Sequence, residues 1–263
     1  MMSYTILIGA EFDKIVSLLM VTLILALALL RARKLLVRAA ADHMAAAELS
    51  RFFAPEVAGR IRASDAAIEP GQAELRDAAI LMVDLRGFTP LSQKLEPAAV
   101  MRLLSEYQSR MVAAIARHGG SIDKFLGDGI LASFGAVRPS VTFAADALRA
   151  LEAVIDAAAL WAEERREAGL PAPEVGAAIA SGKVMFGAIG DASRLEYTVI
   201  GDPVNLAAKL EKHTKEERVP ALCTEQIWRL ALAQGCRPER PGDARARRRV
   251  GGVGEPLDLV ALA

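Results

Sequence analysis

The chain has 263 residues, enough for one sizeable domain together with an appendage. Its 32 basic and 32 acidic residues balance, so the overall charge gives no electrostatic basis for binding nucleic acid. The two cysteines, Cys223 and Cys236, lack the spacing of a metal site or of a disulfide framework. This cysteine usage favours a reducing, cytoplasmic setting for the globular part.

The first segment is apolar and predicts a membrane anchor. Ile15–Leu30 carries no charge and is followed by a basic cluster. The cluster consists of Arg31, Arg33, Lys34 and Arg38. A signal peptide is the alternative, but Glu11 and Asp13 stand where a signal peptide has positive charges. We therefore predict an uncleaved anchor over residues 1–38. The basic cluster places the rest of the chain inside the cell, as a single-pass protein of the inner (plasma) membrane.

A linker is predicted over residues 39–76. Ala39–Phe53 is alanine-rich and reads as a connecting helix, although its apolar pattern is too short to establish a coiled coil. Ala63–Arg76, which contains Pro70 and Gly71, has the composition of a boundary loop. The globular domain is then expected over residues 77–263.

The order of elements in this domain predicts an α+β fold with a ferredoxin-like βαββαβ core. The first elements expected are a strand, a helix, a hairpin and a long helix: Ala78–Leu85, Pro97–His118, Ser121–Gly135 and Ser140–Ala168. Two strands, Glu174–Ala180 and Val184–Ile189, are then expected to flank a hairpin turn at 181–183. A further strand follows at Glu196–Ile200, and after it a helix capped by Asp202 with Pro203 in its first turn. The last elements are a strand near Val219–Thr224, a helix at Glu225–Ala233, and strands near Arg249 and at Leu257–Leu262. The basic residues Arg245 and Arg247–Arg249 are expected in a solvated loop.

Two carboxylates are the first candidates for chemistry. Asp84 ends the apolar run of Ile80–Gly87, and Asp128 lies in the glycine turn of Asp123–Ser133. Either one alone passes as an ordinary turn aspartate. Placed side by side, they would hold a divalent metal, because Mg²⁺ is usually bound by one or two carboxylates together with substrate phosphates. The pair therefore suggests an enzyme acting on a nucleoside triphosphate.

Three motifs together carry a resemblance to a known family. VDLRGFT (Val83–Thr89), DKFLGDGI (Asp123–Ile130) and YTVIGDPVNLAAKLE (Tyr197–Glu211) closely resemble the class III adenylate/guanylate cyclase catalytic domain, in order and in spacing. The resemblance covers roughly Asp77–Leu230. It implies conversion of ATP to cyclic AMP and pyrophosphate with two Mg²⁺ or Mn²⁺ ions in each active site. It also implies a homodimer whose two sites lie across the interface.

The metal half of such a site follows from the first two motifs. Asp84 and Asp128 would bridge both ions, and the carbonyl of Leu85 is a further candidate ligand. The backbone amides of Gly87 and Phe88 could hold phosphate if a helix begins there.

The base half rests on Lys124 and Thr198. Lys124 precedes Asp128 by four residues, which puts both on one face of an extended strand, and a lysine can donate to the N1 acceptor of adenine. In the family, a lysine at this place with a later aspartate or threonine selects adenine, and guanylate cyclases carry a glutamate and a cysteine or similar pair. The pair here resembles threonine-type adenylate cyclases, with guanylate cyclase as the alternative.

Asn205 and Lys209 lie four residues apart on one helix, so they can point at one ligand. In the family, the asparagine orients the ribose, and an arginine usually stands at the place of Lys209 to stabilise the transition state. The resemblance implies that these two residues, with Lys124 and Thr198, face Asp84 and Asp128 of the other protomer. Lysine keeps the charge but loses the planar fork of arginine. A weak enzyme or an inactive regulatory module therefore remains an alternative. A diguanylate cyclase is disfavoured because its Gly-Gly-Asp/Glu-Glu-Phe hairpin is absent.

Overall fold

The computed structural model describes residues 2–50, 57, 59, 71–191 and 193–263. The chain divides into two units, Met1–Pro55 and Glu56–Ala263. The first unit is the helix α1 (Met2–Ser50). The alanine-rich part of the predicted linker therefore continues α1 as far as Ser50. Apart from residues 57 and 59, the rest of that linker up to residue 70 lies outside the described residues.

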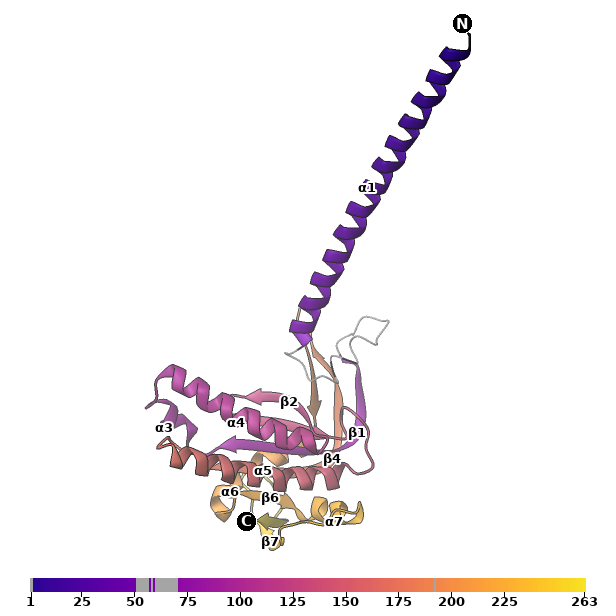
Figure 1. Ribbon diagram of the computed structural model, residues 1–263. Helices are drawn as coiled ribbons and strands as arrows, with labels where there is room; N and C mark the ends of the chain where they lie inside the picture. The colour runs from indigo at the N-terminus through magenta and orange to yellow at the C-terminus, as the bar shows by residue number, and fades with distance from the viewer. Residues whose placement is uncertain (1, 51–56, 58, 60–70, 192) are drawn as a thin grey trace. The chain divides into compact units, whose positions relative to one another are not determined.

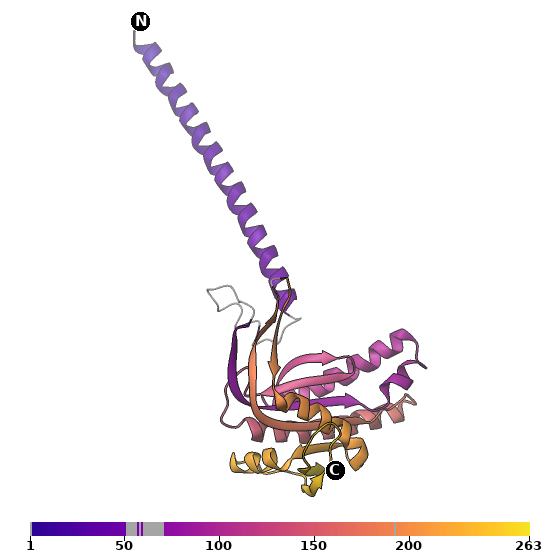
Figure 2. The ribbon, with the colours of Figure 1, turned by 180° about the vertical axis from the view of Figure 1, so that it is seen from behind.

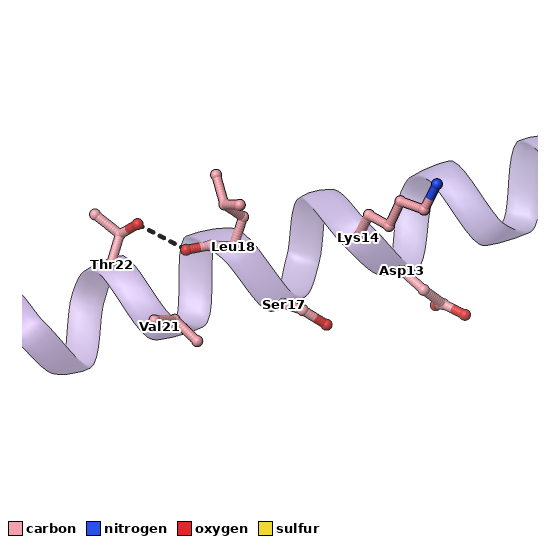
Figure 3. A pocket seen from close by; sticks show the side chains of 6 residues that line it. All are labelled: Asp13, Lys14, Ser17, Leu18, Val21 and Thr22. Carbon is pink, nitrogen blue, oxygen red and sulfur yellow. Dashed lines mark hydrogen bonds between the residues drawn. The ribbon is translucent and has the colours of Figure 1, made fainter.

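Within α1, the segment Glu11–Ala40 is long and apolar enough to cross a membrane, with a mean hydropathy of 2.5. Figure 3 shows that Asp13, Lys14 and Ser17 project from the polar start of this segment. Further along, the Thr22 hydroxyl donates a hydrogen bond of 2.7 Å to the carbonyl of Leu18 (Figure 3). Such a bond satisfies a hydroxyl inside an apolar helix without any partner from outside. The segment is a candidate membrane span that agrees with the predicted anchor.

The second unit is built on one sheet. Its strands are β1 (Ala73–Leu85), β2 (Ser121–Leu126), β3 (Gly129–Phe134), β4 (Val175–Gly190), β5 (Leu195–Ile200), β6 (Ala221–Thr224), β7 (Asp243–Arg248) and β8 (Leu257–Leu262). They are ordered β2-β3-β1-β4-β6-β8-β7, and β5 also pairs with β4. The first four strands, with α4 and α5 as crossovers, form the βαββαβ core that the sequence predicts.

Helices cover both faces of this sheet. The helices of this unit are α3 (Phe88–Ser92), α4 (Pro97–Arg117), α5 (Phe143–Glu167), α6 (Asp202–Glu217) and α7 (Glu225–Ala233). In Figure 1, α4 and α5 lie side by side in front of the sheet, and their core takes in the β1 residues Leu81, Val83 and Leu85. Because side chains alternate along a strand, Met82 points to the other face. There α6 packs against β4 and β1 (Figure 2).

The expected hairpin at 181–183 is wrong, since β4 runs through it without a break. The reason is the length of β1, which begins at Ala73 and not at Ala78. One antiparallel register joins the two strands from Ala73 opposite Gly187 to Leu85 opposite Val175, so no reversal occurs. A side chain at Gly187 would lie 2.1 Å from the carbonyl oxygen of Gln72, and only glycine allows this close approach.

Two further expectations need correction. Gly201, and not Asp202, is the N-cap of α6, and Asp202 is the first residue of the helix. The basic block near the C-terminus is largely part of β7 and does not form a free loop. Arg248 lies 3.1 Å from Glu217 and Arg245 lies 3.9 Å from it, so a carboxylate on α6 draws these side chains onto the domain. The helix Glu225–Ala233 is confirmed, and its N-cap Thr224 accepts from the amide of Ile227.

Candidate functional site

The two candidate metal ligands are brought together by strand register. Asp84 is the penultimate residue of β1, and Asp128 lies in the tight turn between β2 and β3. Val83 pairs with Ile130, which places Asp84 beside the turn. A side-chain carbon built on Gly129 would lie 3.5 Å from Oδ1 of Asp84, so the carboxylate of Asp84 lies directly against the turn that carries Asp128. Because β2 ends at Leu126, the expectation that Lys124 and Asp128 share one extended strand is wrong.

The carboxylate pair is electrostatically unfavourable without a cation. Partial burial, followed by the negative charge of Asp128, raises the pKa of Asp84 from 3.8 to about 6. Two carboxylates this close together repel each other, so a bound proton or a bound cation stabilises them. Within the described residues, no cluster of three or more acidic, histidine or cysteine side chains forms a metal cage. The donors therefore fit a hard divalent ion that takes its remaining ligands from phosphate and water.

A buried acid and a tyrosine surround this pair, and neither was predicted as a site residue. Glu211 on α6 is buried, and burial followed by the charge of Asp84 raises its pKa. Tyr107 on α4 is fully buried, and burial followed by the charges of Asp84 and Asp128 raises its pKa. Lys215 on α6 is the cation that acts on Asp84. Glu211 ends the third motif and could have been suspected, but Tyr107 carries no signal beyond helical periodicity.

Arg86 fixes the backbone just after the metal ligands. Its guanidinium bonds the carboxylate of Glu174 (2.9 Å), the hydroxyl of Thr214 (2.9 Å) and the carbonyl of Val219 (2.6 Å). The guanidinium of Arg86 is thus taken up by a salt bridge and hydrogen bonds within the domain. The next residue, Gly87, has φ +71 and is the N-cap of α3, which begins at Phe88. A phosphate contact at the amides of Gly87 and Phe88 requires a helix that begins there, and α3 provides it. The phosphate contact itself stays a prediction.

Three of the predicted nucleotide-binding residues line one cavity of about 470 Å³: Lys124 on β2, Thr198 on β5 and Asn205 on α6. Met82 also lines it, so the cavity opens on the face of the sheet that α4 and α5 leave free. Its volume suits a small organic ligand. The structure thus brings together side chains that are as much as 81 positions apart in the sequence.

Asp123 and Glu196 organise this cavity and were missed by the sequence analysis. The hydroxyl of Thr198 donates to Asp123 (2.7 Å), which also accepts from the amide of Val199 (3.2 Å). Lys124 forms an ion pair with Glu196 and lies 3.7 Å from Asp123. Neighbouring residues of a regular strand point to opposite faces, but an irregularity between Ile122 and Lys124 lets both side chains turn toward β5. Burial raises the pKa of Asp123, and the Thr198 hydrogen bond opposes that rise.

Asn205 and Lys209 do not point at the same place. Asn205 is exposed and lines the cavity, whereas Lys209 donates to the carbonyl of Gly252 in the loop between β7 and β8. Lys209 does not line the cavity. Their four-residue spacing on α6 is as expected, but Lys209 must leave Gly252 before it can reach a ligand beside Asn205.

The metal carboxylates and the base cavity are separate parts of one chain. Neither Asp84 nor Asp128 lines the cavity. Lys215 is the cation whose charge lowers the pKa of Asp84, and neither Lys124 nor Lys209 contributes to this shift. A nucleotide whose base lies against Lys124 thus meets no metal ligand among the cavity's own residues.

The fold and this site together define an α+β domain with a carboxylate pair suited to a divalent metal ion and a separate cavity of about 470 Å³. The family model described as the adenylate and guanylate cyclase catalytic domain matches residues 72–239. The chain belongs to this family.

Individual relatives agree with this assignment. An adenylate cyclase of Anabaena cylindrica is 38% identical over 164 residues, which is 62% of this chain and 32% of that protein. An uncharacterized protein of Mycobacterium tuberculosis is 35% identical over 153 residues, which is 58% of this chain and 27% of that protein. The chain therefore matches about a third or less of the length of these curated relatives.

Solved structures show the same fold. The adenylyl cyclase CyaB from P. aeruginosa superposes with a TM-score of 0.64 at 25% identity, covering 73% of this chain and 96% of that one. The guanylyl cyclase Cya2 superposes with a TM-score of 0.62 at 31% identity, covering 73% of this chain and 93% of that one. Both kinds of cyclase thus resemble this chain, and the choice of base depends on the cavity.

Proposed function

We propose that the protein is a membrane-anchored adenylate cyclase that converts ATP to 3′,5′-cyclic AMP and pyrophosphate. In this reaction the 3′-oxygen bonds to the α-phosphorus, the bond from that phosphorus to the β-phosphate oxygen breaks, and the 3′ proton passes to water. Two Mg²⁺ or Mn²⁺ ions held by Asp84, Asp128 and the Leu85 carbonyl would acidify the 3′-hydroxyl and neutralise charge on the phosphates.

The observation that carries the choice of ATP is the hydrogen-bond polarity of the base cavity. Because the hydroxyl proton of Thr198 is committed to Asp123, its oxygen lone pairs remain to accept from the 6-amino group of adenine. Lys124 supplies the donor for N1. The edge of adenine needs one donor and one acceptor, and these two side chains provide them.

GTP is the second candidate substrate, because an acidic side chain also lines the base cavity. Guanine presents two adjacent N–H groups, which a carboxylate can accept, and Glu196 lines the cavity. In this structure Glu196 is paired with Lys124, and either base would have to displace that ion pair, so the preference for adenine rests on the acceptor that Thr198 offers. The adenylate cyclase of Anabaena and the guanylyl cyclase Cya2 represent the two outcomes among relatives.

The active site is proposed to form between two copies of the chain. Asn205 would orient the ribose and Lys209 would place a positive charge on the reacting phosphate, both from the protomer that binds the base. Asp84 and Asp128 would come from the partner. The separation of these groups within one chain supports this arrangement. The apolar segment of α1 would anchor the protein in the plasma membrane, with the cyclase domain in the cytoplasm.

The test is product analysis with the full chain in lipid nanodiscs. We expect cyclic AMP from ATP with Mg²⁺ or Mn²⁺, and much less cyclic GMP from GTP. Asp84→Ala should abolish the product. Asp77→Ala is the matched control, because Asp77 lies on the same strand but is exposed and only pairs with Lys183 (3.3 Å). Cyclic GMP as the main product would overturn the choice of base, and no cyclic nucleotide at all would leave a regulatory module.

A further inference from the structure

A second cavity, of about 500 Å³, lies away from the base cavity and shares no lining residue with it. It is formed by the second half of α5, the start of β4 and the turn that follows α6. This size is within the range of small-molecule sites in proteins. Neither the metal carboxylates nor the base-binding residues line it, so the proposed cyclase reaction does not explain it.

The walls of this cavity combine an apolar floor with a cationic rim. The floor includes Val154, Ala158 and Pro220, and arginines from four different segments stand around it. The arginines are Arg86, Arg166, Arg218 and Arg240. Glu174 is the one acidic side chain in the lining, and Arg86 already engages it at 2.9 Å. Arg166 pairs with Glu163 outside the lining, whereas Arg240 pairs with Asp156 outside it and also donates to an oxygen of Ala263, which lines the cavity.

Arg218 differs from the other three because, across the described part of the chain, its side chain makes no hydrogen bond or ion pair. Its backbone is left-handed, with φ 56 and ψ 42, at the C-cap of α6. Glycine is the residue that this position favours, because a side chain there is strained. The chain thus holds an unpaired guanidinium on the cavity rim at a position where glycine would be more stable.

We propose that this cavity binds a small amphipathic organic anion, with a carboxylate, phosphate or phosphonate group on Arg218 and an apolar body on the alanine-rich floor. A guanidinium binds two oxygens of such a group at once, and the floor adds apolar contact that a bare inorganic ion cannot use. The site is distinct from the base cavity and would be occupied independently of the nucleotide.

The test is calorimetric titration of the full chain in nanodiscs with phenylphosphonate, after subtraction of the heat from empty nanodiscs. 2′,3′-Dideoxy-ATP and Mg²⁺ are present to keep the nucleotide site filled. We expect one saturable site per chain, with a dissociation constant below about 1 mM. Arg218→Gly should weaken binding by about tenfold or more. Because glycine suits the left-handed backbone, this variant should melt at the same temperature as the parent chain or higher.

Arg247→Gly is the matched control. Arg247 also has a left-handed backbone, with φ 50, but it lies on β7 outside the cavity, so its replacement should leave binding unchanged. Ala158→Leu should weaken binding by filling the floor. The proposal is overturned if the parent chain shows no saturable binding, or if Arg218→Gly binds as tightly as the parent. It is also overturned if inorganic phosphate binds as tightly as phenylphosphonate, because the floor would then contribute nothing.

Discussion

The metal carboxylates and the base cavity balance their charges in opposite ways. Asp84 and Asp128 repel each other, and the pKa of Asp84 rises to about 6 as a result of burial and this repulsion. In the base cavity, by contrast, Lys124 is paired with Glu196, and Thr198 is bonded to Asp123. The proposed metal half would therefore be incomplete until a cation binds. The side chains of the proposed base half are already paired and would have to exchange these partners when a nucleotide binds.

The largest expected effect comes from neutralising the metal half. Asp84→Asn should lower cyclic nucleotide formation by about a thousandfold or more, because a two-metal site loses a bridging ligand. The same change should stabilise the metal-free chain, by about 1 kcal/mol at pH 7.5 once solvent screening of this half-exposed group is allowed for. A higher melting temperature together with a loss of activity would support the conclusion that the carboxylates of the metal half repel each other, in contrast to the paired side chains of the base half.

The pH dependence of this gain has a definite sign. Since the folded-state pKa of Asp84 is raised from 3.8 to about 6, the folded chain binds the proton more tightly than the unfolded chain. The cost of the ionised carboxylate is therefore full above pH 6 and absent below about pH 4. Melting curves in EDTA should show the parent chain and Asp84→Asn diverging as the pH rises between these values. Equal melting temperatures at pH 7.5 would contradict the account of the carboxylate pair.

The next effect concerns the base half. Thr198→Val removes the acceptor proposed for the adenine amino group and leaves the buried Asp123 without that donor. We expect kcat/KM for ATP to fall by about 10- to 100-fold, together with a loss of about 1–3 kcal/mol in stability. Thr142→Val is the matched control, since Thr142 donates to Asp146 at 2.7 Å outside both sites. A kcat/KM close to that of the parent chain would remove Thr198 from base recognition.

A smaller effect is expected at Lys209. Its bond to the Gly252 carbonyl competes with phosphate, and its single ammonium group cannot contact two oxygens in one plane. Lys209→Arg should raise kcat by about tenfold if the planar fork reaches the phosphate. Lys212→Arg on the same helix is the control and should have no effect. A fall in kcat in Lys209→Arg would show that the lysine is suited to its surroundings and does not limit the rate.

The smallest effect should come from Glu196. Glu196→Gln would release Lys124 from its ion pair, so adenine could bind Lys124 without first breaking that pair. We expect KM for ATP to fall by about two- to fivefold, with little change in kcat, because an exposed ion pair contributes about 1 kcal/mol or less. Steady-state kinetics with ATP measures this directly. A higher KM would mean that Glu196 itself contacts the substrate.

The sequence predicted the fold well where patterns are local. The βαββαβ core, the helix at Glu225–Ala233 and the apolar segment of α1 follow from periodicity and capping. The hairpin at 181–183 was predicted from a Ser-Gly-Lys turn pattern, yet the strand continues because the long β1 offers it a partner along its whole length. That partner is far away in the sequence, so a local pattern cannot reveal it.

The site shows the same limit. Asp84, Asp128, Lys124, Thr198 and Asn205 stand in motifs, and the structure brings the first two together beside one turn and the other three to one cavity, while their roles stay predictions. Asp123 was missed because strand alternation puts it on the wrong face, and only the irregularity in β2 turns it toward Thr198. The engagement of Lys209 by Gly252 depends on a contact between α6 and a loop 43 positions later in the chain.

The most direct test of the account mixes two inactive variants. Asp84→Ala destroys the metal half and Asn205→Ala the nucleotide half, so each alone should be inactive. If the active site forms across two chains, a mixed dimer keeps one intact site, and co-reconstitution in equal amounts should restore about a quarter of the parent rate by random pairing. Recovery of cyclic AMP formation is the result we expect. No recovery in a preparation whose mixed dimers are confirmed by pull-down of differently tagged chains would contradict a site shared between protomers.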